Sequence, residues 1–125
     1  MAKIQSRSKK KESGGRYKDF RKAKDFELAG IPTLTKIGEK KLKQIRVLGG
    51  NLKNKLMNNE FVNAYNGKSK KYEKVKIKAV LENPANRHFV RMNIITKGCV
   101  VDTEKGKVKI NSRPGQDGSL DGVFV

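Results

Sequence analysis

The sequence has very little of the chemistry that enzymes and metalloproteins use. Its 125 residues include one cysteine, Cys99, one histidine, His88, and no tryptophan. A single cysteine excludes an internal disulfide and is typical of a reducing compartment. Two soft ligands cannot form a tetrahedral zinc site, and a Cys–His catalytic pair would need an orienting group that nothing in the sequence indicates. We predict no enzyme, no metal and no cofactor, with Cys99 as a small buried hydrophobe on a strand.

Long apolar runs are missing as well. No segment is apolar enough to cross a bilayer, and no signal-peptide hydrophobic region follows the first lysines. The glycine patterns of phosphate-binding and dinucleotide-binding loops are absent, and the acidic residues are isolated rather than paired. These absences predict a cytoplasmic protein whose partner is neither a membrane nor a small molecule.

Positive charge is what the sequence has in excess. It holds 30 Lys and Arg against 12 Asp and Glu, a formal net charge of +18, with an isoelectric point near 10.2. Such a field predicts a polyanionic partner, most simply nucleic acid, with an acidic membrane as the rival. Residues 98–125 carry four charges of each sign, so the excess lies entirely in residues 1–97. We interpret this last quarter of the chain as structural closure of the fold.

Residues 1–30 are predicted to form a basic N-terminal extension that is disordered until it binds RNA. Its first 24 residues carry ten Lys and Arg against two acids. They hold too little apolar material to offset the entropy of ordering the chain, roughly 1–2 kcal/mol per residue. Residues 16–29, with Tyr17, Phe20 and Ala23 at three-residue spacing, allow a turn or two of helix. A tail that only adds solubility is the alternative.

Residues 31–125 predict an all-β domain, a small antiparallel β-barrel, with a sandwich as the alternative. In the clearest strand, residues 72–82, four apolar side chains alternate with three lysines and Val80, which predicts one buried face; the four are Val75, Ile77, Ala79 and Leu81. Residues 104–106 predict a hairpin with Gly106 at a left-handed position. Residues 87–97 are expected to be irregular and 113–118 to form a long turn. The expected strands are 42–48, 52–57, 61–65, 72–82, 98–103, 107–112 and 122–125.

Arginine is rare in this domain and lies beside its turns. Its planar fork grips phosphate with two hydrogen bonds and stacks on bases, so each of the four arginines is a candidate phosphate contact, with a surface salt bridge as the alternative. His88 and Phe89 could stack on an unpaired base, although Phe89 fits a core position equally well. Neither a recognition helix nor a zinc module for reading duplex DNA is visible. Folded RNA is therefore the favoured partner.

The candidate RNA-binding residues lie in both segments. In the extension, Gly14 and Gly15 with interleaved serines favour an extended strand that threads between phosphate backbones. The candidates there are Lys3, Arg7, Lys9, Lys10, Lys11, Arg16, Lys18, Arg21 and Lys22. The candidates in the barrel domain are Arg46, Asn51, Lys53, Arg87, His88, Arg91, Lys97 and Arg113.

Seven blocks of the sequence, taken together, resemble one family. They are QSRS (5–8), SGGR (13–16), TKIG (35–38), RVLGGN (46–51), ENPAN (82–86), NIITKG (93–98) and SRPGQDG (112–118). In this order they resemble the small-subunit ribosomal protein family S8e of archaea and eukaryotes, and the short loop at 66–71 resembles its archaeal form. Ser6 stands where the family usually has glycine, and Ser13 where it often has threonine.

The resemblance implies a β-barrel body with a basic N-terminal extension, built into the small ribosomal subunit. Its partners would be the small-subunit rRNA and neighbouring small-subunit ribosomal proteins. Two other functions stay open at this point. One is a ribosome-assembly factor that binds precursor rRNA transiently, and the other is a protein that coats nucleic acid without specificity.

Overall fold

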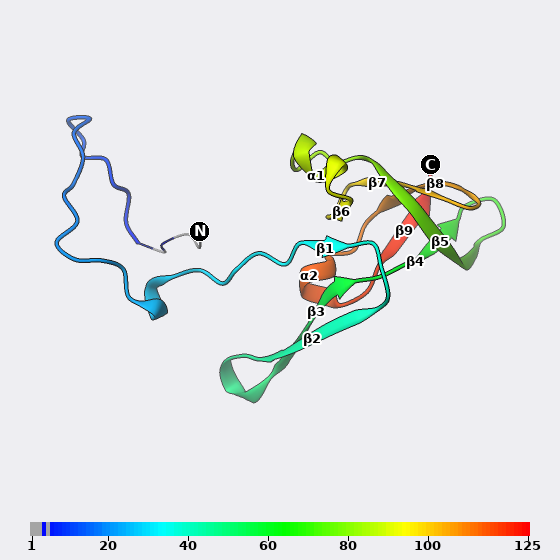
Figure 1. The fold of residues 1–125 in the computed structure, drawn as a ribbon, viewed down its shortest axis with the longest axis horizontal. Helices are drawn as coiled ribbons and strands as arrows, with labels where there is room; N and C mark the ends of the chain where they lie inside the picture. Colours follow the sequence, from blue (N-terminus) through cyan, green and yellow to red (C-terminus); the bar gives the residue numbers. More distant parts are fainter. Residues whose placement is uncertain (1–3, 5) are drawn as a thin grey trace. The chain divides into compact units, whose positions relative to one another are not determined.

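The structure, a computed structural model, describes Ile4 and residues 6–125 of the chain. The chain divides into two units, Met1–Pro32 and Thr33–Val125. Within the described residues, every named strand and both α-helices belong to the second unit, which Figure 1 shows from β1 to β9. The second unit therefore carries the fold.

Five strands of the second unit close into a barrel, in the order β4-β5-β7-β8-β9. Neighbouring strands pair antiparallel, except that β4 and β9 close the barrel as a parallel pair. The predicted all-β fold with a small barrel is confirmed, and the parallel closing pair is a feature that the sequence pattern does not reveal. The strands are β4 (Phe61–Asn66), β5 (Lys71–Glu82), β7 (Val100–Thr103), β8 (Gly106–Ile110) and β9 (Asp121–Phe124).

Medium-sized aliphatic side chains fill the core of this unit. Successive residues of a strand point to opposite faces, so every second side chain can turn inward, and a small barrel needs no large aromatic ring to fill it. The core therefore forms in a chain that lacks tryptophan. Its buried members are Leu56, Val62, Ala64, Val75, Ile77, Val80, Ile95, Cys99, Val101, Val108, Ile110 and Leu120.

The alternation of β5 changes phase halfway along the strand. Val75 and Ile77 are buried as predicted, but beyond them Val80 is buried and Leu81 is exposed. The pairing of β5 with β7 shifts register between Ile77 and Ala79 and again beyond Val80. An extra residue in one strand reverses which side chains face the core. The predicted inward position of Leu81 is therefore wrong.

A second sheet, in the order β2-β3-β1-β6, shares the core of the barrel through Leu56 and Ile95. Strand β1 pairs parallel to β3, and the other pairs are antiparallel. The buried Thr35 hydroxyl donates to the Leu56 carbonyl at 2.7 Å, which ties β1 to β3. The strands are β1 (Thr35–Lys36), β2 (Lys41–Arg46), β3 (Leu52–Asn58) and β6 (Ile94–Ile95).

Short helical turns occupy segments that were expected to be irregular. A 3₁₀ turn, η2 (Leu48–Gly50), ends the strand predicted to run to residue 48. Residues 87–97 contain α1 (Arg87–Arg91) and β6, and residues 113–118 contain α2 (Pro114–Asp117). The Asn86 side chain starts α1 by accepting from the His88 backbone N–H at 2.9 Å. The irregular assignment of 87–97 is thus wrong, because this N-cap was not recognised.

The predicted hairpin between β7 and β8 is confirmed. Thr103 and Gly106 are the last paired residues on either side of its two-residue loop. Gly106 has a φ of 135°, within the positive range that favours glycine.

The described part of the first unit has one helical element, the 3₁₀ turn η1 (Asp25–Glu27). Of residues 16–29, where the sequence allowed a turn or two of helix, only η1 is helical, and Tyr17, Phe20 and Ala23 lie outside it. A short isolated helix is marginal in water, and a helix over residues 17–23 would have no apolar surface to pack against, since Tyr17 and Phe20 are exposed.

Cys99 is fully buried next to β7, and its carbonyl accepts from the Ile110 N–H at 2.9 Å. Burial raises the pKa of the Cys99 thiol, which keeps the sulfur protonated and unreactive. His88 is exposed on α1. The predicted burial of Cys99 is confirmed, but the residue lies just before β7 rather than on a strand.

Gly122 lies where β9 closes the barrel. A Cβ atom there would lie 2.6 Å from the Lys109 carbonyl oxygen and 2.6 Å from Val108 Cγ1. We expect Gly122→Ala to lower the free energy of unfolding by about 1–3 kcal/mol, because overpacking displaces the backbone. The control is Gly67→Ala in the β4–β5 turn, where a Cβ would meet no atom within 4 Å. Urea unfolding followed by circular dichroism measures both, and equal losses would contradict the argument.

Candidate nucleic-acid interface

Every predicted RNA-binding residue in the described part of the chain is exposed. Lys3, and Gln5 of the first sequence block, lie outside the described residues. Exposure is needed for contact with phosphate, but it does not decide which residues act together. The structure sorts the candidates into three groups: one in the first unit, one on β2, β3 and α2, and one around α1.

The first of the two groups in the second unit lies on a two-stranded ribbon, β2 with β3, and on α2. Arg46 ends β2, while Asn51 and Lys53 lie at the start of β3. Lys53 Nζ donates to Gln116 Oε1 of α2 at 2.8 Å, a contact between residues 63 positions apart. Arg113, which precedes α2, is therefore brought close to the β2–β3 ribbon. This proximity could not be read from the sequence.

The turn that carries Arg113 is held in one conformation. Pro114 opens α2, and the Arg113 backbone N–H donates to the Asp117 carboxylate at 2.8 Å. Gly118 ends the turn at a φ of 74°, where a Cβ would lie 2.8 Å from the Asn54 Cβ of β3. Glycine is therefore required where the turn meets the ribbon. Because the backbone of this turn is already fixed, only the exposed Arg113 side chain has to be ordered when a ligand binds.

The other group in the second unit lies on α1. Arg87, His88 and Arg91 are exposed, whereas Phe89 and Val90 are half-buried and Val90 packs against the core. Residues three and four apart share one face of a helix, so the two arginines and the imidazole form a single outward face. The half-buried Phe89 therefore fits a core position better than a base-stacking role.

Asn83 fixes the segment that precedes α1. This side chain is buried, and its Nδ2 donates to the Ile94 carbonyl at 3.0 Å. Its Oδ1 accepts from Thr96 Oγ1 at 2.8 Å and from the Ala85 N–H at 3.1 Å. These bonds join the end of β5, the turn before α1 and the loop after β6, which carries Lys97. The hydrogen bonds of the Asn83 amide thus hold the segments on either side of α1 in place.

The structure does not bring the two groups of the second unit together. In Figure 1, α1 lies at the top of this unit and the end of the β2–β3 ribbon projects from the bottom. The candidates of the second unit therefore form two separate groups. A ligand that engages both groups has to extend across this unit.

In the first unit, residues 9–17 form a small hairpin. The Tyr17 N–H donates to the Lys9 carbonyl at 2.9 Å, and the backbones of Lys10 and Arg16 form an isolated antiparallel β-bridge. Gly14, with a φ of 83°, allows the chain to reverse direction there. The sequence favoured an extended strand over these residues, and the structure instead turns them back on themselves.

Two predicted cations of this unit have acidic partners. Lys9 Nζ lies 3.0 Å from the Asp19 carboxylate, and the Arg21 guanidinium donates to both Glu27 carboxylate oxygens, at 2.9 and 2.7 Å. The hydrogen bond from Arg21, aided by the Lys24 backbone N–H, lowers the pKa of Glu27. A phosphate that binds Arg21 must therefore displace a carboxylate.

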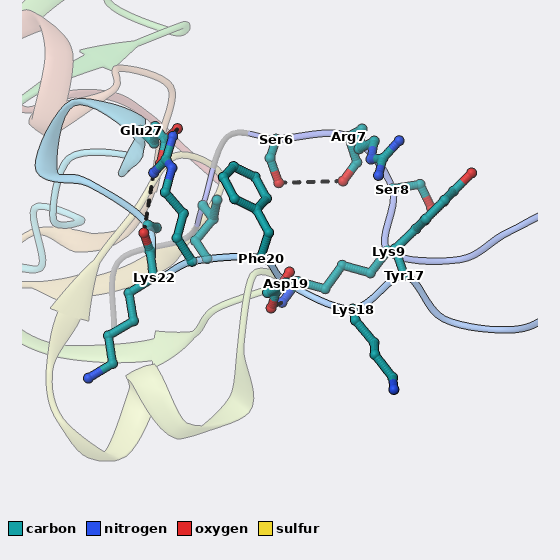
Figure 2. Close-up of a pocket in the computed structure, with 13 residues that line it drawn as sticks. Ser6, Arg7, Ser8, Lys9, Tyr17, Lys18, Asp19, Phe20, Lys22 and Glu27 are labelled. Atoms are coloured by element: carbon teal, nitrogen blue, oxygen red, sulfur yellow. Dashed lines mark hydrogen bonds and ion pairs between the residues drawn. The ribbon is translucent and has the colours of Figure 1, made fainter.

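Aromatic rings lie among these cations, as Figure 2 shows for Tyr17 and Phe20. The Arg7 guanidinium lies 3.9 Å from the centroid of the Tyr17 ring. Phe20 is 90% exposed, and Phe26 is exposed as well. Exposed rings next to cations suit stacking on unpaired bases. Sequence reasoning missed them because it assigned Tyr17 and Phe20 to one side of a helix, although their alternation with lysine was visible.

No group of three or more His, Cys, Asp and Glu that could hold a metal ion occurs among the residues that the structure describes. No helix formed by those residues is both long and apolar enough to cross a membrane.

Known proteins resemble this chain along nearly its whole length. Residues 4–125 match the family model for ribosomal protein S8e. Small ribosomal subunit protein eS8 of Nanoarchaeum equitans is 49% identical over 121 residues, 97% of this chain and 95% of that protein. The protein of the same name from Methanocorpusculum labreanum is 46% identical over 121 residues, 97% of each chain. That of Picrophilus torridus is 42% identical over 125 residues, all of both chains.

Removing the Asn83 side chain should destabilise the second unit. We expect Asn83→Ala to cost about 2–3 kcal/mol of unfolding free energy, because the buried Ile94 carbonyl and the Thr96 hydroxyl lose their partner. The matched control, Asn86→Ala, removes only an exposed helix cap and should cost about 1 kcal/mol. Urea unfolding measured by circular dichroism distinguishes them. An Asn83 variant as stable as the Asn86 variant would show that the bonds of the buried amide contribute little.

Proposed function

Because the chain belongs to the ribosomal protein S8e family, we propose that it is a structural constituent of the small ribosomal subunit that binds rRNA. The resemblance drawn from the seven blocks is confirmed by the family match over residues 4–125 and by the archaeal relatives. The proposed role is structural rather than catalytic, on the ribosome in the cytoplasm. The partners are the small-subunit rRNA and neighbouring small-subunit proteins.

The observation that carries RNA binding is a large set of exposed cations with few acidic partners. The chain has 30 Lys and Arg. Among the residues that the structure describes, ion pairs engage only Lys9, Arg21, Lys76 and Lys105. RNA phosphates supply the missing negative charge, and binding releases the counterions condensed on the RNA.

The geometry favours folded RNA over a DNA duplex. The helices α1 and α2 span five and four residues. Both are much shorter than the recognition helices that read bases in the DNA major groove. Folded RNA is recognised by backbone shape and by its unpaired bases. Separated groups of exposed cations, such as those on α1 and on the β2–β3 ribbon with α2, suit such a target.

The N-terminal segment, residues 1–30, supports the same function as a basic extension. We infer that it takes its final conformation on rRNA and is disordered without it. Its support is the exposure of Arg7, Lys10, Lys11, Arg16 and Lys18, together with the exposed aromatic rings beside them. Chain ordering and phosphate contact would then occur in one step.

Salt dependence tests the proposed function. With six to eight phosphate contacts, the plot of log affinity for small-subunit rRNA fragments against log salt concentration should have a slope of roughly −4 to −7. Filter binding between low and moderate salt measures it, and a duplex DNA of equal length is the control. A slope near zero, or a preference for the duplex, would contradict the proposal. Sedimentation with precursor particles alone would indicate an assembly factor instead.

Deleting residues 1–30 tests the extension. We expect the shortened chain to bind rRNA at least about tenfold more weakly, since it loses several phosphate contacts, while its thermal unfolding stays unchanged. In the free full-length chain, NMR amide shifts of residues 6–24 should lack dispersion, and those from about Thr33 should be dispersed. Protected, dispersed amides in the free extension would refute ordering on binding.

A further inference from the structure

One element of the second unit concentrates positive charge without any acidic residue. From Lys40 to Asn59 the sequence contains six Lys and Arg and no Asp or Glu. These residues include the β2–β3 ribbon, which projects from the body in Figure 1. Five of the six residues of β2, and the first three residues of β3, are exposed. Only the base of the ribbon, at Leu56, enters the core.

Lysines face one another across the ribbon. Lys43 pairs directly with Lys55, and Lys53 lies two residues before Lys55, on the same face of β3. Like charges directly opposite each other destabilise an antiparallel pair. A phosphate placed between them converts this repulsion into attraction. The arrangement is unfavourable for the free protein and favourable for a polyanion complex.

The tip of the ribbon holds an apolar side chain in solvent. Leu48 is 95% exposed, more than any other large apolar side chain that the structure describes. Gly49 and Gly50 follow it with φ of 72° and 76°, a tight reversal that favours glycine. The Val47 N–H donates to the Asn51 carbonyl at 2.7 Å, and Asn51 Nδ2 donates to the Leu48 carbonyl at 3.2 Å. The tip is therefore closed, and Leu48 projects from a bonded turn.

We propose that the β2–β3 ribbon is an RNA-insertion element: it lies along a shallow groove of folded rRNA and places Leu48 against an unstacked base. The minor groove of A-form RNA is wide and shallow enough to admit protein, and its flanking phosphates would meet Lys43 and Lys55. Apolar wedges at the tips of basic elements enter nucleic acid where bases unstack. This inference rests on the proposed function and names its contact site.

Charge argues for RNA against the other occupants of an exposed leucine. A tip that docked on a protein would need a partner surface acidic enough to offset six cations within 20 residues. Neighbouring arginines reinforce the choice of RNA. Arg46 Nη2 lies 4.0 Å from the position of a Cβ on Gly50, and Arg113 is brought close to the ribbon by the Lys53–Gln116 bond. Arg46 thus lies beside the tip turn that carries the wedge, and the other cations lie along the ribbon.

The first experiment removes the wedge without removing charge. We expect Leu48→Ser in the full chain to weaken binding to transcribed small-subunit rRNA roughly 5- to 20-fold, as for a leucine partly buried against one base, with an unchanged salt slope. Val125→Ser, at another exposed apolar position, should leave affinity unchanged. Unchanged thermal unfolding of both variants shows that they remain folded. Chemical probing of the RNA should show one local group of nucleotides losing protection in the Leu48 variant.

The second experiment removes charge from the ribbon. Lys43→Gln with Lys55→Gln should lower the magnitude of the salt slope by about 1.4–1.8, two phosphate contacts. Lys78→Gln with Lys109→Gln, two exposed lysines of the barrel, removes the same charge and should change the slope by less than half as much.

The outcomes separate the inference from the function on which it rests. If wild type binds rRNA with a steep slope but the Leu48 and Lys43/Lys55 variants behave like their controls, the insertion element is wrong and the proposed function stands. If wild type does not bind rRNA, both are wrong. If Leu48→Ser leaves rRNA affinity unchanged but abolishes binding to anionic vesicles or to a ribosomal protein, the tip serves that partner and the inference is overturned.

Discussion

Closure of the barrel between β4 and β9 is the contact on which the rest of the second unit depends. It is a parallel pairing between strands separated by most of the domain, held at Ala64 and Gly122 and reinforced by Asn63 Nδ2, which donates to Asp121 at 2.9 Å. Strand β9 also packs closely against β8, because Gly122 has no side chain to meet the Lys109 carbonyl. The closed barrel leaves none of its five strands with a free edge, an advantage for a chain with few aromatics to cover one.

The same closure positions Arg113, one of the candidate RNA-binding residues. Helix α2 lies between β8 and β9 in the chain, so the path of β9 back to β4 carries α2 against β3. Gly118 then meets Asn54, and Arg113 is held close to the β2–β3 ribbon. Asn83 likewise positions α1, through buried hydrogen bonds, while the arginines of α1 stay exposed. Neutral polar side chains form these buried contacts between elements, because burying a charge without a partner would cost far more free energy.

The positive charge, unlike the core, does not stabilise the fold. Its self-repulsion opposes folding, and the barrel tolerates it because the cations lie on outward faces where water screens them. Where cations gather without acids, as on the β2–β3 ribbon, the free protein is less stable than it could be. The proposed rRNA partner, which supplies phosphates, would explain that arrangement. The side chains that stabilise the body and those proposed to bind rRNA thus lie on opposite faces of the same strands.

The sequence by itself determined the class of partner, the family and the kind of fold. Net charge, turn spacing and the alternation in β5 are local properties, and periodicity of two and charge density need no tertiary information. The phase change that buries Val80 instead of Leu81 and the parallel β4–β9 pair depend on partners distant in the chain. The grouping of Arg113 with the β2–β3 ribbon was decided by tertiary structure alone, because a contact between residues 63 positions apart leaves no periodic signal. The exposure of Leu48 was decided by the projection of the ribbon from the body.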